Sequence, residues 1–215
     1  MPTQALALAL AASIYPPAVA AVIALGRGSE VRLRVAVFVL ACVIATYAVG
    51  TLLLFLLIDL GVSGPKHRTP GAVIDLALGV ALLLLAVWLH RRVPDSAKPS
   101  ASRIERYLQS VRLVFVLGVT LYILPSPIYI GAVKAIADAN LSTSSQLLWL
   151  AATVAVMLWL IELPMLMLLT FPERAVTALE AVNAWFSRHG RLLAVIVSAA
   201  AGVYLLVKGL VDLIG

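Results

Sequence analysis

Long runs of apolar residues, separated by short polar connections, dominate the chain. A helix needs about 20 apolar residues to cross the hydrocarbon core of a bilayer. Backbone polar groups find no water in that core, so a run of this length is expected to be helical. Six runs meet the requirement and predict six transmembrane helices, at Gln4–Gly26, Val35–Leu60, Gly71–Leu89, Val111–Ala137, Leu147–Phe171 and Leu192–Ile214.

Composition supports lipid as the solvent of this chain. Apolar residues make up 63% of the 215 residues, charged residues make up 12%, and the mean hydropathy is +1.07. Soluble domains are about half apolar and about a quarter charged. The sequence therefore predicts an all-α polytopic membrane protein with one membrane domain over residues 1–215. The first run has no basic residue before it, unlike a signal peptide, and we interpret it as a retained span.

The distribution of basic residues predicts the orientation. Twelve of the 16 lysines and arginines lie in the first, third and fifth connections. The positive-inside rule places these connections in the cytoplasm and both termini outside the cytoplasmic membrane. The net charge of +6 thus needs no nucleic acid as partner, and it favours contact with anionic lipid head groups.

Two of the cytoplasmic segments carry helical patterns of apolar residues. Residues 91–110 end with Ile104 and Leu108 on one face, and residues 172–191 place Val176, Leu179 and Val182 on another. Such segments either lie in the head-group region as amphipathic helices or serve as simple connectors. The pattern leaves both interpretations open.

The two halves of the chain resemble each other. The first and fourth runs each hold two prolines and a nearby tyrosine, namely Tyr15, Pro16 and Pro17, and Pro125, Pro127 and Tyr129. Aligning Gly79 with Gly202 brings the third and sixth runs into register. Each repeat has three spans, an odd number, so the second copy must enter the membrane from the opposite side. The sequence predicts inverted three-helix repeats at residues 1–90 and 111–215, joined by a basic linker at residues 91–110.

The paired prolines are the first candidates for a functional site. A proline inside a helix removes a backbone hydrogen bond and clashes with the preceding turn. Irregular backbone at membrane depth is tolerated where it is buried or lines a cavity. The alternative is a packing kink without a ligand. We predict a translocation site formed by Tyr15, Pro16, Pro17, Pro125, Ser126, Pro127 and Tyr129.

Ionisable residues inside the runs are the second group of candidates, because a charge at bilayer centre costs about 2.5–3.5 kcal/mol even on the lenient scale. Glu162 is the deepest and either couples transport to a proton or cation or is a structural carboxylate. Asp75 is expected near the outer surface, where it either lines a vestibule or is simply hydrated. Lys134 could contact an anionic head group, although pairing at i,i+4 explains Lys134 with Asp138 as well as Lys208 with Asp212.

Catalytic and metal-binding patterns are absent from the sequence. The three histidines, His67, His90 and His189, are far apart and do not have the spacing of metal ligands. The chain contains no Walker motif and no GxSxG motif. We therefore expect neither an enzyme nor a bound metal or cofactor.

Several stretches resemble a known family. The segment IYPPAVAAVIALG and the segment GVYLLVKGL resemble motifs of the lysine-exporter superfamily. Within it, LPSPIYIGAVKAIADAN and LLTFPERAVTALEAVNAWFSRHGR are similar to the sulfolipid-addressing and glycopeptidolipid-addressing proteins. This resemblance implies a six-span inverted-repeat protein that helps to export envelope lipids, with the motif prolines Pro16, Pro17, Pro125 and Pro127. The adjacent Pro16 and Pro17 lack the intervening glycine of amino-acid exporters, and the single Cys42 argues against a thiol relay.

These observations lead to one function and two alternatives. The first is a transporter that exports an envelope lipid, glycolipid or lipid-linked intermediate across the cytoplasmic membrane. The second is an exporter of small solutes, such as amino acids or metal ions. The third is a non-transporting scaffold that holds a lipid synthase or a large lipid exporter. A homo-oligomer is compatible with each of them.

Overall fold

The computed structural model describes residues 3–25, 30–60, 68–91, 110–139, 141–170 and 172–214. All the regular secondary structure in these ranges is helical, which confirms the predicted all-α class. The helices are α1 (Thr3–Ala12), α2 (Pro16–Leu25), α3 (Val31–Asp59), α4 (Arg68–Arg91), α6 (Val111–Tyr122), α7 (Pro127–Ala137), α8 (Thr143–Thr170) and α9 (Pro172–Ile214).

Four helices in the described ranges are long and apolar enough to cross a membrane, and a fifth candidate span is bent. The four lie in α3, α4, α8 and α9, and the bent pair is α6 with α7, whose axes differ by 70°. The first predicted run is split into α1 and α2, each of 10 residues. A 10-residue helix is only about 15 Å long, half of the hydrocarbon core. The structure therefore gives four to five candidate spans where the sequence predicts six.

The last helix differs most from its predicted bounds. Helix α9 runs for 43 residues from Pro172 to Ile214, so the segment at residues 172–191 continues into the last span. The segment is therefore helical, as its apolar pattern indicates. The side chains of Val176, Leu179 and Val182 lie outside the described residues, as does the whole of residues 92–109. Helix α8 contains Pro164 without a break in its secondary structure.

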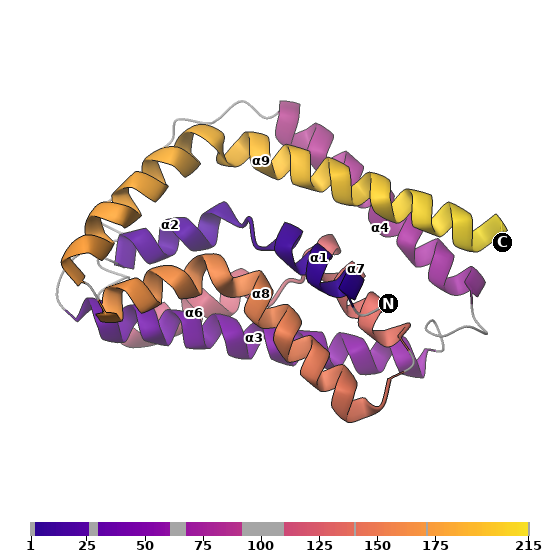
Figure 1. Ribbon diagram of the computed structural model, residues 1–215, viewed down its shortest axis with the longest axis horizontal. Helices are drawn as coiled ribbons and strands as arrows, with labels where there is room; N and C mark the ends of the chain where they lie inside the picture. The colour runs from indigo at the N-terminus through magenta and orange to yellow at the C-terminus, as the bar shows by residue number, and fades with distance from the viewer. Residues whose placement is uncertain are drawn as a thin grey trace.

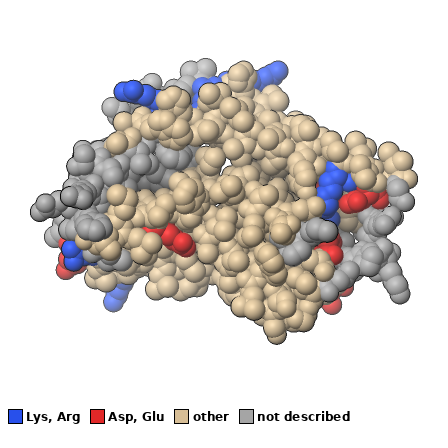
Figure 2. Space-filling view, viewed as in Figure 1, with Lys and Arg blue, Asp and Glu red and all other residues tan. Residues whose placement is uncertain are grey.

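The helices form an elongated bundle (Figure 1). Helices α4 and α9 lie along one side, α3, α6 and α8 lie along the other, and α1, α2 and α7 lie between them. The outer surface is apolar, with Leu52 68% exposed and Leu148 71% exposed. On the face of the molecule seen in Figure 2, charged side chains are sparse and most of them lie at the edges. A bilayer would cover such a surface.

Helices α4 and α9 pack antiparallel and closely through glycine. A Cβ atom built on Gly79 would lie 2.9 Å from the carbonyl oxygen of Gly202, and one built on Gly202 would lie 3.0 Å from the carbonyl oxygen of Gly79. The contacts with side chains are also reciprocal, because Gly79 faces Leu206 and Gly202 faces Leu83. Small residues at a helix crossing let two backbones approach within a membrane, where dispersion contacts drive association.

Candidate functional site

The first break in the helices lies at residues 13–15, before the first proline pair. The hydroxyl of Ser13 donates to the carbonyl of Leu10 at 2.7 Å and accepts from the indole Nε1 of Trp159 at 3.2 Å. Helix α2 then begins at Pro16, where the missing amide hydrogen costs nothing because the first turn of a helix leaves that donor unused. The break is thus held by a side chain from α8.

The second break lies at residues 123–126, between α6 and α7. Ser126 caps α7, because its hydroxyl accepts a hydrogen bond from the backbone amide of Tyr129 at 3.2 Å. Pro127 occupies the first turn, as Pro16 does in α2. The prediction that the paired prolines interrupt both helices is therefore confirmed.

The two breaks lie close together in the bundle. The rings of Tyr15 and Tyr122 pack edge to face, with their centroids 5.5 Å apart. Tyr15 belongs to the first break and Tyr122 ends α6 at the second. Pro17 is exposed, whereas Pro125 and Pro127 are half-buried. The side chain of Pro16 lies outside the described residues. Among the described residues at the two breaks, the contact between Tyr15 and Tyr122 is the one that joins them, and Tyr129 instead contacts α3.

Tyr129 anchors α7 on α3. Its hydroxyl donates to the carbonyl oxygen of Thr46 at 2.8 Å, and its side chain is only 1% exposed. The hydroxyl occupies the space that a side chain at Gly50 would need. Glycine at position 50 is therefore a condition for this contact.

We expect Gly50→Ala to destabilise the protein by about 1–3 kcal/mol, because the added methyl group overlaps the Tyr129 hydroxyl. Tyr129→Phe, which removes the hydroxyl and its hydrogen bond, should cost about 1 kcal/mol. The double variant should lose less free energy of unfolding than the sum of the two single variants, because removal of the Tyr129 hydroxyl makes room for the methyl group at position 50. Thermal unfolding in detergent measures the three values, and strictly additive losses would contradict the contact.

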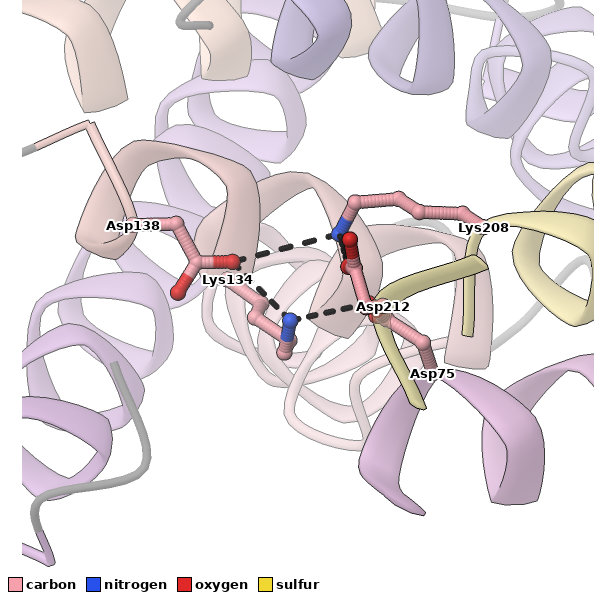
Figure 3. A network of polar contacts seen from close by, with 5 residues as sticks. All are labelled: Asp75, Lys134, Asp138, Lys208 and Asp212. Atoms are coloured by element: carbon pink, nitrogen blue, oxygen red, sulfur yellow. Dashed lines mark hydrogen bonds and ion pairs between the residues drawn. The ribbon is translucent and has the colours of Figure 1, made fainter. Parts of the chain in front are cut away.

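A network of charged side chains joins α4, α7 and α9 (Figure 3). The Lys134 Nζ atom lies 2.9 Å from Asp75 Oδ2 and 2.9 Å from Asp138 Oδ2. The Lys208 Nζ atom lies 2.6 Å from Asp75 Oδ2, 3.9 Å from Asp138 Oδ2 and 4.0 Å from Asp212 Oδ2. Asp75 thus links the first half of the chain to two lysines of the second half.

The centre of this network is shielded from solvent. Asp75 is 1% exposed and Lys134 is 2% exposed. Charges buried in this way are stable only when they are paired. Asp75 Oδ1 is buried and has no hydrogen-bond partner among the described residues. Because two carboxylates already hold the Lys134 ammonium, this lysine is not available to an anionic head group in the arrangement seen here, and Asp75 is enclosed rather than open to a vestibule.

Glu162 lies apart from this network, on α8. Its side chain is half-buried, and no hydrogen bond or ion pair joins it to another described residue. It follows Trp159 by three residues, which places both on the same face of the helix. Because Trp159 bonds to Ser13, this face of α8 is directed towards the first break.

An apolar groove of about 570 Å³ lies between α1 and α9. Its walls are formed by Thr3, Gln4, Ala7, Leu8 and Ala11 of α1 and by Ile196, Val197, Ala200, Ala201 and Tyr204 of α9. The space-filling view is hollowed at this place, between the α9 side and the central helices (Figure 2). Its size falls in the range of small-molecule sites in proteins.

The sequence interpretation missed the joint role of Lys208, Asp138 and Asp212. Each lysine was explained by the aspartate four residues away on its own helix. One signal was available, because Asp75, Lys134 and Lys208 are all predicted near the same membrane surface. Three charged residues inside apolar runs at one depth favour a shared network over three separate local pairs.

The fold and the site define a polytopic α-helical membrane protein with broken helices at its centre. The family model of Sap, sulfolipid-1-addressing protein, matches residues 5–211, nearly the whole chain. The chain therefore belongs to this family, as its motifs indicate. No match was found among curated proteins or among solved structures.

Proposed function

We propose that this protein exports an envelope lipid or glycolipid, or a lipid-linked intermediate, across the cytoplasmic membrane. The observation that carries the proposal is the apolar groove between α1 and α9, whose lining residue Tyr204 lies one helical turn before Lys208 of the charged network. An apolar groove with polar side chains among its lining residues suits a lipid, which has a hydrocarbon chain and a polar head group. Membership in a family that is described as addressing a sulfolipid supports the same substrate class.

The proposed architecture is six spans in two inverted repeats. Helices α1 and α2 form one broken span, equivalent to the bent pair of α6 and α7. The contact between Gly79 and Gly202 supports this arrangement, since equivalent residues of two inverted repeats meet where the pseudo-two-fold axis passes between them. Both termini lie outside, and the basic connections lie in the cytoplasm.

The proposed mechanism is a movement of one half against the other. Transporters with inverted repeats expose a central site to each side in turn by such movements. Here the breaks around Tyr15 and Tyr122 lie at the centre, and Asp75 with Lys134 and Lys208 connects the halves at one end. These ion pairs stabilise the arrangement in which that end is closed, and outward release requires them to separate.

Glu162 is the proposed coupling group on α8, because it is ionisable, lies deep in its span and shares the helix face of Trp159, which is directed towards the first break. A Glu162→Gln variant should insert normally and lose most of its transport rate. Leu163→Gln, which changes the exposed neighbour on the same helix, is the matched control. Transport at the wild-type rate by Glu162→Gln would remove Glu162 from the mechanism.

Lipid profiling of a deletion strain tests the function in cells. Surface lipids and total lipids are extracted separately and compared by mass spectrometry. We expect one lipid class to decrease at the surface and accumulate inside, and plasmid-borne protein to restore it. Unchanged amounts and locations of every lipid class would contradict lipid export and favour efflux of a small solute.

A further inference from the structure

Two helix faces form the walls of the groove between α1 and α9. The lining residues recur at positions 3, 4, 7, 8 and 11 of α1 and at positions 196, 197, 200, 201 and 204 of α9, which is the spacing of one helix face on each side. Alanine occupies the middle of both walls, at Ala7 and Ala11 on α1 and at Ala200 and Ala201 on α9. Because the alanine side chain is a single methyl group, the two faces leave a groove between them.

The groove opens onto the lipid-facing surface of the protein. Large apolar side chains in its walls and next to them are exposed, with Leu10 at 54%, Ile196 at 53% and Val203 at 52%. An apolar space of this kind stays dry. At this depth the protein is surrounded by the hydrocarbon chains of the bilayer. The occupant that this position provides is therefore an acyl chain that enters sideways from the membrane.

The charged network indicates the depth of the groove. Charged side chains in a span reach towards the edge of the hydrocarbon core, and Lys208 and Asp212 are both partly exposed. On α9, Tyr204 lies about 6 Å from Lys208 along the helix axis and Ile196 lies about 18 Å from it. The hydrocarbon of one leaflet is about 15 Å thick. The groove thus runs through the leaflet next to the network, which is the outer leaflet in the proposed orientation.

Hydrogen-bond donors line the end of the groove nearest the network. Helices α1 and α9 run in opposite directions (Figure 1), so Thr3 and Gln4 lie at the same end as Tyr204. Their hydroxyl and amide groups donate hydrogen bonds. An ester-linked acyl chain carries its carbonyl acceptor at the end next to the head group. This acceptor is common to acyl lipids with neutral, phosphorylated and sulfated head groups.

We propose that the α1–α9 groove binds an ester-linked acyl chain of a membrane lipid in the outer leaflet, with the ester carbonyl at Gln4 and Tyr204 and the chain end at Val197. This inference rests on the proposed lipid-export function and specifies which part of the lipid the protein holds. The chain lies between Ala7 and Ala200, and the head group lies beside the network. The groove recognises the chain and its carbonyl, so lipids with different head groups fit the site.

Native mass spectrometry of the purified, delipidated full-length protein tests recognition of the carbonyl. The probes are dipalmitoyl phosphatidylglycerol, whose chains are ester-linked, and dihexadecyl phosphatidylglycerol, which has the same head group and chain length but ether links without a carbonyl. We expect the protein to retain the ester lipid about fivefold better, the effect of one hydrogen bond. Gln4→Leu with Tyr204→Phe should remove this difference, and Tyr47→Phe on α3 should preserve it. Equal retention of the two lipids by the wild-type protein overturns the proposed recognition.

Two variants fill the groove from opposite walls. Ala200→Trp and Ala7→Phe each place a large side chain in the groove and should abolish retention of the ester lipid. Ala151→Trp, on the exposed surface of α8, should leave it unchanged. Circular dichroism verifies that each variant is folded, and normal retention by the folded groove variants overturns the groove as the site.

Photoactivatable chains test the direction in which the lipid lies. One phosphatidylglycerol carries a diazirine beside the carbonyl and a second carries it at the chain end, and mass spectrometry of peptides locates the label after illumination. We expect the first probe to label the protein around Gln4 and Tyr204 and the second around Ala11 and Val197. The reverse order overturns the placement of the carbonyl.

These measurements, together with lipid movement in vesicles, separate this inference from its rivals. If a dimer of the wild-type protein dissociates in Ala200→Trp, a second copy occupies the groove and the lipid site is wrong. If the ester lipid binds as expected but is not moved across vesicle membranes, the site stands and the export function falls. If lipid is moved but Ala200→Trp retains the ester lipid normally, the export function stands and the site falls.

Discussion

Asp75→Ala is expected to destabilise the protein by about 3–5 kcal/mol, the cost of removing one partner from a buried ion pair. The loss leaves the Lys134 ammonium, 2% exposed, with Asp138 alone, and it removes the shortest contact of Lys208. It also removes the ion pairs that join α4 to α7 and α9. The apparent melting temperature in detergent should fall strongly.

The control for this variant is Asp212→Ala. Asp212 contacts Lys208 at 4.0 Å and is 40% exposed, so its removal should cost no more than about 1 kcal/mol. A second comparison tests whether the loss of stability comes from the unpaired charge of Lys134. Asp75→Asn with Lys134→Met removes both charges of the central pair and should be more stable than Asp75→Asn alone. Equal melting temperatures for Asp75→Ala and Asp212→Ala would show that the network is not a buried structural element.

Substitutions at Gly79 and Gly202 are also expected to destabilise the protein strongly, and by equal amounts. An alanine methyl group at Gly79 would lie 2.9 Å from a backbone oxygen of α9, and one at Gly202 would lie 3.0 Å from a backbone oxygen of α4. Backbone cannot move aside as a side chain does, so the two helices must separate. We expect each Gly→Ala variant to lose about 1–3 kcal/mol, and valine at either position to lose more.

Gly131→Ala is the matched control for the crossing. Its nearest neighbour would be a side-chain atom of Leu205 at 3.4 Å, which is an ordinary contact distance. This variant should unfold within a few degrees of the wild-type protein. Clearly unequal losses at Gly79 and Gly202 would contradict the near-symmetric crossing on which the proposed inverted repeat depends.

The sequence predicts well the positions of the long apolar helices, which the thickness of the bilayer determines, and the helix breaks, which proline determines. The apolar runs have the length of a membrane span, so their centres coincide with α3, α4, α8 and the last part of α9. Proline lacks an amide hydrogen and cannot continue a helix undisturbed, so the breaks before Pro16 and Pro127 could be placed. The alignment of Gly79 with Gly202 came from local similarity, and the structure brings these two residues into contact.

The features that were missed depend on tertiary packing. Hydropathy marks where a helix enters lipid, which is why it could not show that α9 begins at Pro172, 20 residues before the apolar run. The grouping of Asp75, Lys134 and Lys208 depends on how α4, α7 and α9 rotate against one another, and local pairing explained each lysine without it. The requirement for glycine at position 50 likewise depends on a tyrosine 79 positions away in the chain.

Lipid movement by the purified protein tests the central claim most directly, because it removes every other component of the envelope. The protein is reconstituted into vesicles that carry a labelled glycolipid in one leaflet, and the label reaching the other leaflet is measured over time. The account predicts movement by the wild-type protein, and loss of movement when Pro16, Pro17, Pro125 and Pro127 are all replaced by alanine in protein that still inserts. Absence of movement by correctly inserted wild-type protein, combined with normal lipid export in cells that carry the proline variant, would contradict the account and identify the protein as a scaffold.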